Sequence, residues 1–93
     1  MNPVKIYKNQ VAHGMDRIAD CVLYVVFCLG MTPTQKVIDK CIFDEVSSPA
    51  TTYKKINQLK KLGFIEEVNH EEDKDKRKTY LRITDAGQQY LKG

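Results

Sequence analysis

Apolar residues form a nearly continuous run in one segment of the chain and recur at regular spacing in others. This pattern predicts the secondary structure of the chain. Between Ile18 and Leu29 only Asp20 is polar, which predicts a first helix that starts near residue 13 or 15 and ends at Gly30. A surface helix shows a single apolar stripe, whereas this helix is apolar nearly all round and must be covered on two sides. A chain of this size covers one of those sides with its own residues.

The second side of this helix is expected to contact another copy of the chain. Tyr24, Phe27 and Cys28 are the residues expected at that homodimer contact, if they form the face turned away from the core. The alternative is that an N-terminal arm, residues 1–12, wraps this side together with the C-terminal helix.

A capping signal predicts the second helix. Thr32 is expected to cap it, with Pro33 at the first helical position and Gln35 reaching back to complete a capping box. The helix is expected to end near Asp44, and its apolar face at helical spacing is formed by Val37, Ile38, Cys41 and Ile42.

A third helix is predicted from Ser48, a capping residue followed by Pro49, to about residue 62, where Gly63 ends it. The residues expected to face the core are Thr52, Ile56 and Leu59. The opposite side carries Ala50, Lys54, Asn57 and Lys61, flanked by Thr51, Tyr53 and Gln58. This helix therefore has one face for the core and one polar, basic face.

Two short segments with alternating side chains follow the third helix. Residues 64–69 and 78–83 are predicted to be strands, joined by a connection at about 69–78 that is rich in charge. Thr84 with Asp85 is expected to cap a last short helix that reaches Leu91. The expected fold class is mainly α with a small β-hairpin (α+β). Its order is arm, three helices, strand, wing, strand and helix, which is a winged helix-turn-helix.

The composition fits a single domain, residues 1–93, with 42% hydrophobic and 29% charged residues. The net charge is only +3, but residues 31–62 contain six lysines and three acidic residues, so the positive excess surrounds the third helix. The apolar run of the first helix is shorter than the roughly 20 residues of a membrane span. The first ten residues do not resemble a signal peptide, and a cytoplasmic protein without a membrane partner is expected.

Catalytic motifs are lacking in the sequence. His13 and His70 are far apart and show no metal-ligand spacing, and there is no glycine-rich phosphate loop or nucleophile elbow. We therefore expect no enzyme activity, no cofactor and no metal. Cys21, Cys28 and Cys41 are expected to be reduced thiols packed as small hydrophobic side chains, with a redox-sensing role as the alternative.

The polar side of the third helix carries side-chain types that contact double-stranded DNA. Amides and hydroxyls hydrogen-bond base edges and phosphates, and lysines neutralise phosphates. The candidate DNA-binding residues of this helix are Ser48, Thr51, Tyr53, Lys54, Asn57, Gln58 and Lys61. A merely solvated helix face would look similar. The hairpin that follows favours DNA binding, because a helix and a wing together fit a groove and its flank.

The predicted wing has no net charge, since residues 71–78 contain four acidic and four basic residues. The basic residues come last, and Lys76, Arg77 and Lys78 are the candidate DNA-binding residues of the wing. An arginine at a wing tip suits the narrow, electronegative minor groove of A·T-rich DNA. Asp75 is expected to brace Arg77 or the turn, with a simple turn residue as the alternative.

Four short motifs resemble the MarR family of winged-helix transcriptional regulators. They are L-x-x-L-G-F-I at 59–65, D-K-R at 75–77, L-R-I-T at 81–84 and the glycine at 87. The resemblance covers about half of the chain, and related winged-helix groups share parts of it. It implies that Arg77 enters the minor groove, that Asp75 holds the wing, and that the third helix reads the major groove.

The chain departs from the family in length. Family members usually carry extended terminal helices that form the dimer and shelter a small-molecule pocket, whereas this chain ends at Gly93. We therefore assign no small-molecule effector, and we expect the first helix to form the dimer. Two-fold symmetry would then place two recognition helices on successive major grooves, about 34 Å apart.

The sequence thus predicts a homodimeric, sequence-specific DNA-binding protein, most simply a transcriptional regulator, with its recognition helix at about 48–62. The alternative is a winged-helix module that binds another protein within a replication or transcription assembly. A neutral wing and a modest net charge fit that alternative.

Overall fold

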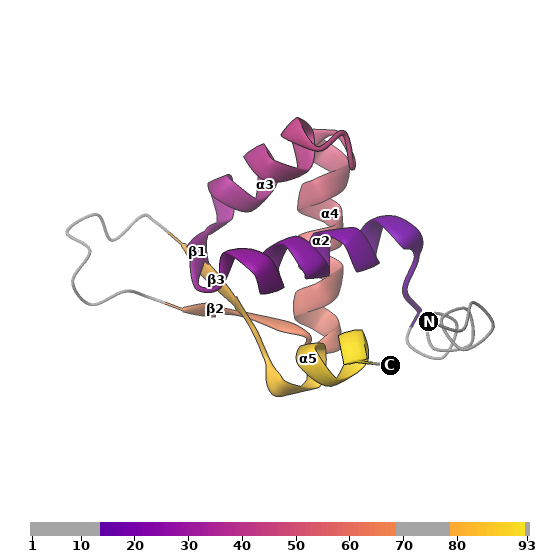
Figure 1. Cartoon of the computed structure of the whole chain (residues 1–93), viewed down its shortest axis with the longest axis vertical. Coiled ribbons are helices and arrows are strands. Elements are labelled where there is room, and N and C mark those ends of the chain that lie inside the picture. Colours follow the sequence, from indigo (N-terminus) through magenta and orange to yellow (C-terminus); the bar gives the residue numbers. More distant parts are fainter. Residues whose placement is uncertain (1–13, 69–78, 93) are drawn as a thin grey trace.

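The computed structural model describes residues 14–68 and 79–92, which form four helices and three strands around one core. The helices are α2 (Arg17–Leu29), α3 (Thr34–Phe43), α4 (Pro49–Leu62) and α5 (Asp85–Lys92). The strands are β1 (Thr32–Pro33), β2 (Ile65–Val68) and β3 (Tyr80–Ile83). Figure 1 shows α4 crossing behind α2, with α3 beside the upper end of α4, the sheet at one side and α5 beneath. The expected arm and wing, residues 1–12 and 69–78, lie outside the described residues.

The first described helix, α2, begins slightly later than its sequence pattern predicts. Asp16 precedes it in extended backbone, and its Oδ1 atom accepts a hydrogen bond from the Ala19 amide at 2.7 Å. This cap fixes the first turn because it satisfies an amide that has no partner inside the helix. Gly30 ends the helix with a φ of 72°, as the sequence predicted.

The connection between α2 and α3 differs from the prediction. Thr32 and Pro33 do not start a helix but form β1, which pairs with β3 in the register Thr32↔Leu81 and Pro33↔Tyr80. Thr32 is therefore buried in the sheet and does not cap α3. The same Thr-Pro pair suits a helix start and an edge strand, because proline lacks only the amide that an edge strand leaves unpaired.

The start of α3 is instead held by the sheet. The Thr34 amide donates to the Thr79 carbonyl at 2.9 Å, and the Thr34 hydroxyl donates to the same oxygen at 3.1 Å. Gln35 does not complete a capping box, since its Nε2 atom donates to Asp39 Oδ1 one turn later, at 2.9 Å. Strand pairing thus replaces the side-chain cap expected at this helix end.

A tight turn joins α3 to α4 and sets the helix-turn-helix geometry. Glu45 takes a left-handed conformation (φ 56°), and the Val46 amide donates back to the Cys41 carbonyl at 2.8 Å. The predicted start of α4 is confirmed: Ser48 is its cap, accepting from the Thr51 amide at 3.3 Å, and Pro49 is its first residue. The predicted end is confirmed as well, at Gly63.

The sheet has the order β1-β3-β2, and both pairings are antiparallel. β2 and β3 form the hairpin that the sequence predicted, in the register Ile65↔Ile83 to Val68↔Tyr80. β1 adds a third strand on the outer edge of β3, which the sequence did not predict. β3 is therefore the central strand, paired with β2 on one edge and with β1, which leads into α3, on the other.

Helix α5 packs closely against the junction of α4 and β2. A Cβ atom at Gly87 would lie 2.2 Å from the Phe64 carbonyl oxygen, so only glycine allows this approach. The Phe64 and Tyr90 rings stack with their centroids 5.0 Å apart, and the Tyr90 hydroxyl donates to Asp20 Oδ1 at 2.5 Å. Burial, followed by this bond to Asp20, raises the pKa of Tyr90 well above its usual value.

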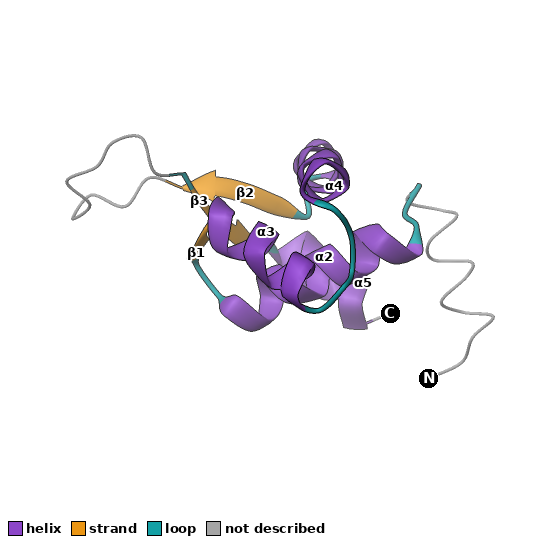
Figure 2. Cartoon of the chain, turned by 90° about the horizontal axis from the view of Figure 1, so that it is seen from above, coloured by secondary structure: helices purple, strands orange, loops and turns teal. Residues whose placement is uncertain are grey.

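The core lies between α2, α3, α4 and the sheet. Its fully buried residues include Leu23, Val26, Val37, Ile56, Leu59, Ile65 and Leu81. Seen from above, α4 stands to one side of α2 and the sheet extends away from both (Figure 2). The arrangement is a winged helix-turn-helix, which confirms the predicted fold class.

Two apolar residues are placed differently from their prediction. Cys28 is exposed rather than packed in the interior, whereas Cys41 is buried and Cys21 half-buried. Ile42 was expected on the apolar face of the second helix but is 44% exposed, because the last turn of α3 extends beyond the core. An apolar residue type alone does not reveal that its helix face has no neighbour.

Candidate nucleic-acid interface

The outer face of α4 presents a group of side chains to solvent. Tyr53, Lys54, Asn57 and Lys61 are all exposed, as their spacing predicted. The opposite face is held in the core by Thr52, Ile56 and Leu59, each at most 1% exposed. The helix therefore presents its polar residues from a rigidly anchored backbone, as a site for reading DNA requires.

The lysines of α4 fall into two classes. Lys55 forms an ion pair with Asp16, and Lys60 forms one with Glu67 of β2. Lys54 and Lys61 form no ion pair with any of the described residues. Their charges are thus available to an external anion, while the other two lysines hold α4 against its neighbours.

The ion pair of Lys55 also ties α4 to the start of α2. Partial burial acts to raise the pKa of the Asp16 carboxyl, but the bonds from Lys55 and from the Ala19 amide lower it below its usual value. Gln58, a predicted DNA-binding residue, contacts the same segment, because its Nε2 atom donates to the Gly14 carbonyl at 2.8 Å. Gln58 is thereby held beside the exposed group rather than within it.

The N-terminal end of α4 carries two further candidates, Ser48 and Thr51. Besides its role as cap, the Ser48 hydroxyl donates to the Thr51 hydroxyl at 3.0 Å. Thr52, one residue further on, donates to the Ser48 carbonyl at 2.8 Å and contacts the Ser47 hydroxyl. The two candidates thus lie at the helix end where amides point outward and the helix dipole favours a phosphate.

Only the base of the predicted wing belongs to the described residues. There Arg82 of β3 forms an ion pair with Glu66 across the β2–β3 pairing. The tip residues that the sequence singled out lie outside the described residues: Asp75, Lys76, Arg77 and Lys78. Their assignments remain predictions.

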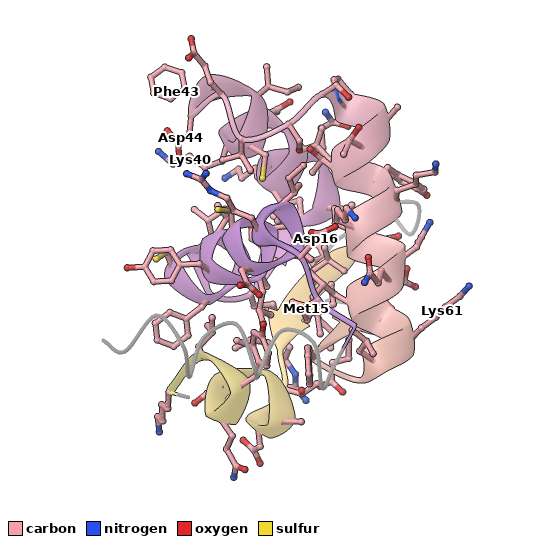
Figure 3. All side chains as sticks on the ribbon, turned by 90° about the vertical axis from the view of Figure 1, so that its right-hand side faces the viewer. Met15, Asp16, Lys40, Phe43, Asp44 and Lys61 are labelled. Atoms are coloured by element: carbon pink, nitrogen blue, oxygen red, sulfur yellow. The ribbon has the colours of Figure 1, made fainter. Side chains whose placement is uncertain are left out.

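The apolar residues expected at a dimer contact are exposed on α2. Tyr24 and Phe27 of α2 are 58% and 47% exposed, and Cys28 is exposed beside them. Figure 3 shows Lys61 projecting from α4 on one side of the molecule and Phe43, another exposed aromatic residue, lying at the end of α3 on the other.

The described ranges, 14–68 and 79–92, contain no cluster of side chains suited to holding a metal ion. Among the helices within these ranges, none has the length and apolar character needed to cross a membrane.

The sequence matches no protein-family model and no curated protein. The fold is similar to that of FabT from Streptococcus pneumoniae, solved in complex with DNA, with a TM-score of 0.69 and 19% identity. That match covers 84% of this chain and 50% of FabT.

Two further solved structures have the same fold. A mutant MarR from E. coli, complexed with operator DNA, has a TM-score of 0.71 and 14% identity, with 94% of this chain and 58% of that one covered. A mutant MepR from a multidrug-resistant S. aureus clinical isolate has a TM-score of 0.70 and 12% identity, covering 95% and 60%. The chain thus spans 50 to 60% of these three proteins, and the similarities show a MarR-like winged-helix fold.

The sequence predicted the exposed face of α4. It did not predict which side chains of α4 are held by contacts with other elements. Asp16 was not a candidate, although it both caps α2 and pairs with Lys55. A signal for the cap existed in the sequence, since aspartate before an apolar helix is a common N-cap. No local signal existed for the pairs of Lys55 and Lys60 or for the bond of Gln58, because their partners come from other elements.

Proposed function

We propose that this protein is a sequence-specific double-stranded DNA-binding regulator of transcription, acting in the cytoplasm. In this proposal α4 enters the major groove, and residues 69–78 form a wing at the minor groove. The observation that carries it is the exposed group on α4, in which Lys54 and Lys61 are unpaired among the described residues while Lys55 and Lys60 are ion-paired. The fold shared with FabT and MarR, both solved with DNA, supports it.

Each exposed residue of α4 has a proposed role. Lys54 and Lys61 neutralise phosphates on the two sides of the groove, and Asn57 hydrogen-bonds a base edge. Tyr53 supplies an apolar ring with a hydroxyl, suited to a thymine methyl group or a sugar. Ser48 and Thr51 bind a phosphate at the N-terminal end of the helix, and Gln58 contributes from the margin of this group.

The wing residues act beside this helix. Arg77 enters the minor groove, Lys76 and Lys78 approach the flanking phosphates, and Asp75 braces the arginine. These roles rest on residue chemistry and on the family motif, since the residues lie outside the described part of the chain.

The working form is proposed to be a homodimer with its contact on α2. The proposal includes no catalytic step, no cofactor and no small-molecule effector. A protein-docking module is the competing function, and the dependence of binding on salt separates the two. DNA binding that releases counterions gives a steep linear fall of log affinity with log salt, whereas a protein-docking module shows almost no affinity for duplex DNA.

Two lysine variants test the proposed interface. Lys54→Ala should weaken binding to all duplexes alike and reduce the salt slope by about one unit, because one phosphate contact is lost. Lys60→Ala is the matched control on the same helix, and since Lys60 is paired with Glu67 its salt slope should equal that of the wild type. Equal losses of affinity and slope in both variants would contradict the assignment of α4's outer face.

Asn57→Ala tests sequence recognition. Loss of a hydrogen bond to a base should reduce the preference for the best site over random duplex by about 1–3 kcal/mol, with little change of the salt slope. The measurement is selection of sites from a random pool, followed by titration of the best and the random duplex. An unchanged preference would mean that Asn57 reads no base.

A further inference from the structure

The C-terminal end of α3 exposes two apolar residues beside acidic ones, a surface that we call the α3 end patch: Asp39, Ile42, Phe43 and Glu45. Phe43 is 80% exposed, the largest fraction among the large apolar residues within 14–68 and 79–92, and Ile42 beside it is 44% exposed. An aromatic ring left in water contributes nothing to the core. A partner that covers this ring would therefore gain free energy that the fold itself does not use.

Lys40 and Asp44 restrain the Phe43 ring. The Lys40 Nζ atom lies 5.3 Å from the centre of the ring, and it also pairs with Asp44 Oδ1 at 3.3 Å. Figure 3 shows these three residues together at the end of α3, well apart from Lys61 of α4. A side chain that is partly ordered in advance loses less entropy when a partner binds.

Glu45 brings a carboxylate to the patch in a conformation that glutamate rarely takes. Its φ of 56° lies in the left-handed region, where glycine and asparagine are favoured. Its carboxylate forms no ion pair with any residue in the described part of the chain. Glycine would make the same turn without strain, so the turn does not explain the glutamate. Backbone strain of this kind gathers at functional sites, which points to a role for the side chain.

The charge around the ring selects the class of partner. Residues 39–45 contain three acidic residues and one lysine, although the whole chain has a net charge of +3. Asp39 precedes Phe43 by four positions, a spacing that places two side chains on the same face of a helix. Nucleic acid and acidic proteins would be repelled here, whereas a basic segment is attracted. Arginine fits best, because its planar guanidinium both stacks on an aromatic ring and pairs with a carboxylate.

The exposed apolar area suits a short segment rather than a folded domain. Phe43 and Ile42 together expose roughly 200 Å², the area of about one aromatic side chain. A standard interface between two folded proteins buries ~800 Å² on each partner. We therefore expect a weak contact, with a Kd on the order of 100 µM.

We propose that the α3 end patch binds an arginine-bearing segment of a partner protein, with a guanidinium stacked on the exposed Phe43 ring. The carboxylates of Asp39 and Glu45 attract the basic residues of that segment, and Ile42 contacts its apolar part. This inference goes beyond the proposed DNA-binding function and does not depend on it. The patch shares no residue with the group on α4 that is proposed to contact DNA.

Fluorescence anisotropy with the full chain tests the proposal. The probe is a labelled peptide of alternating arginine and alanine, and the control probe replaces each arginine with citrulline, its uncharged analogue. The wild type should bind the arginine peptide at least about ten-fold more tightly than the citrulline peptide. Phe43→Leu keeps an apolar side chain but removes the ring, and it should weaken binding of the arginine peptide about two- to five-fold. Phe43→Tyr keeps the ring and should bind this peptide like the wild type.

Variants of Glu45 separate its carboxylate from its backbone. Glu45→Gln removes the charge and should weaken binding of the arginine peptide about two- to five-fold. Glu45→Gly also relieves the left-handed strain, so it should lose the same affinity without a fall in melting temperature. Met31, 48% exposed and outside the patch, supplies the matched control: Met31→Ala should bind the peptide like the wild type. A Glu45→Gly variant with unchanged affinity would overturn the role of the carboxylate.

The remaining outcomes separate this inference from the proposed function and from other occupants of the patch. A wild type that binds duplex DNA but no arginine peptide at millimolar concentration would overturn the patch and leave the DNA-binding function standing. Peptide binding without any affinity for duplex DNA would support the patch and overturn the DNA-binding function. Loss of duplex affinity in Phe43→Leu would assign the patch to nucleic acid, and loss of self-association in the same variant would assign it to a second copy. Either result would overturn the protein partner.

Discussion

The side chain of Thr84 joins the end of α4 to the start of α5: its hydroxyl donates to the Gly63 carbonyl at 2.6 Å. The hydroxyl oxygen of Thr84 accepts a hydrogen bond from the Gly87 amide at 3.1 Å. The backbone amide of Thr84 donates to the Phe64 carbonyl at 2.9 Å. One residue thus satisfies a carbonyl at the C-terminus of α4 and an amide at the N-terminus of α5. The position of α4 depends on this link as well as on the core.

Replacement of Thr84 by valine should destabilise the fold. Thr84→Val keeps the shape of the side chain but leaves the Gly63 carbonyl and the Gly87 amide without this partner, at a cost of about 1–3 kcal/mol. Thr84→Ser keeps the hydroxyl and should lose much less. Urea unfolding of the three proteins measures the difference, and a valine variant as stable as the wild type would show that water replaces both bonds.

Variants of Asp16 separate its cap from its charge. Asp16→Ala removes both and should cost about 0.5–2 kcal/mol, whereas Asp16→Asn keeps the cap and should cost less than about 1 kcal/mol at neutral pH. The folded-state pKa of Asp16 is lowered, so the charge stabilises the fold above the ordinary value of 3.8 and loses this effect as the pH falls through the folded-state pKa.

The difference between the wild type and Asp16→Asn should therefore be constant near pH 6 and shrink below about pH 4. Thermal unfolding measured from pH 7 to pH 3 checks this course. A difference that is the same at both ends of the range would mean that the ion pair with Lys55 contributes nothing to stability.

The three cysteines should react with a thiol reagent in the order of their exposure. Cys28 is exposed and should be alkylated first, Cys21 more slowly, and Cys41 only when the fold opens. Burial raises the pKa of the Cys41 thiol, with further effects from Asp44 and Cys21, so little thiolate forms there near pH 8. Mass spectrometry after timed alkylation gives the order, and early modification of Cys41 would contradict the buried placement.

Protection of Cys28 should also depend on concentration. If the proposed homodimer contact on α2 joins two copies, alkylation of Cys28 slows as the protein passes from low to high micromolar concentration, while the rate at Cys21 changes less. A Cys28 rate that does not vary with concentration would contradict the proposed contact.

Arg77→Ala should weaken DNA binding without affecting the fold. Loss of a minor-groove contact of this kind costs on the order of 1–3 kcal/mol, and the loss should be largest on A·T-rich flanks. Arg82→Ala is the matched control, since Arg82 lies at the base of the hairpin and is paired with Glu66. Duplex titration and thermal unfolding of both variants test this, and equal affinity of Arg77→Ala and the wild type would exclude the role implied by the family motif.

Local signals in the sequence predicted the elements whose ends are set by local chemistry. The caps of α4 at Ser48 and Gly63 are confirmed, because each depends on neighbouring residues and on the backbone conformation that they favour. The exposed face of α4 was predicted for a similar reason, since its helical period separates Ile56 from Asn57 and Lys54.

Tertiary partners decided the features that the sequence did not predict. The Thr32–Pro33 pair fits a helix start as well as an edge strand, and only the neighbouring β3 selects the strand. In a helix as apolar as α2, composition does not distinguish Cys28 from the buried Val26. The bond that holds Gln58 ends on a carbonyl 44 positions earlier in the chain, beyond the reach of any motif.

The bond between Tyr90 and Asp20 has a consequence for the order in which the molecule folds. It joins residues 70 positions apart, and contacts of such separation cost much loop-closure entropy before they stabilise anything. The β2–β3 pairing and the α3–α4 turn connect residues much nearer in the chain. We therefore expect α5 to dock after the rest of the core has formed and to detach first under stress. Amide protons of α5 should accordingly exchange with solvent at a lower free energy of opening than those of α2 and α4.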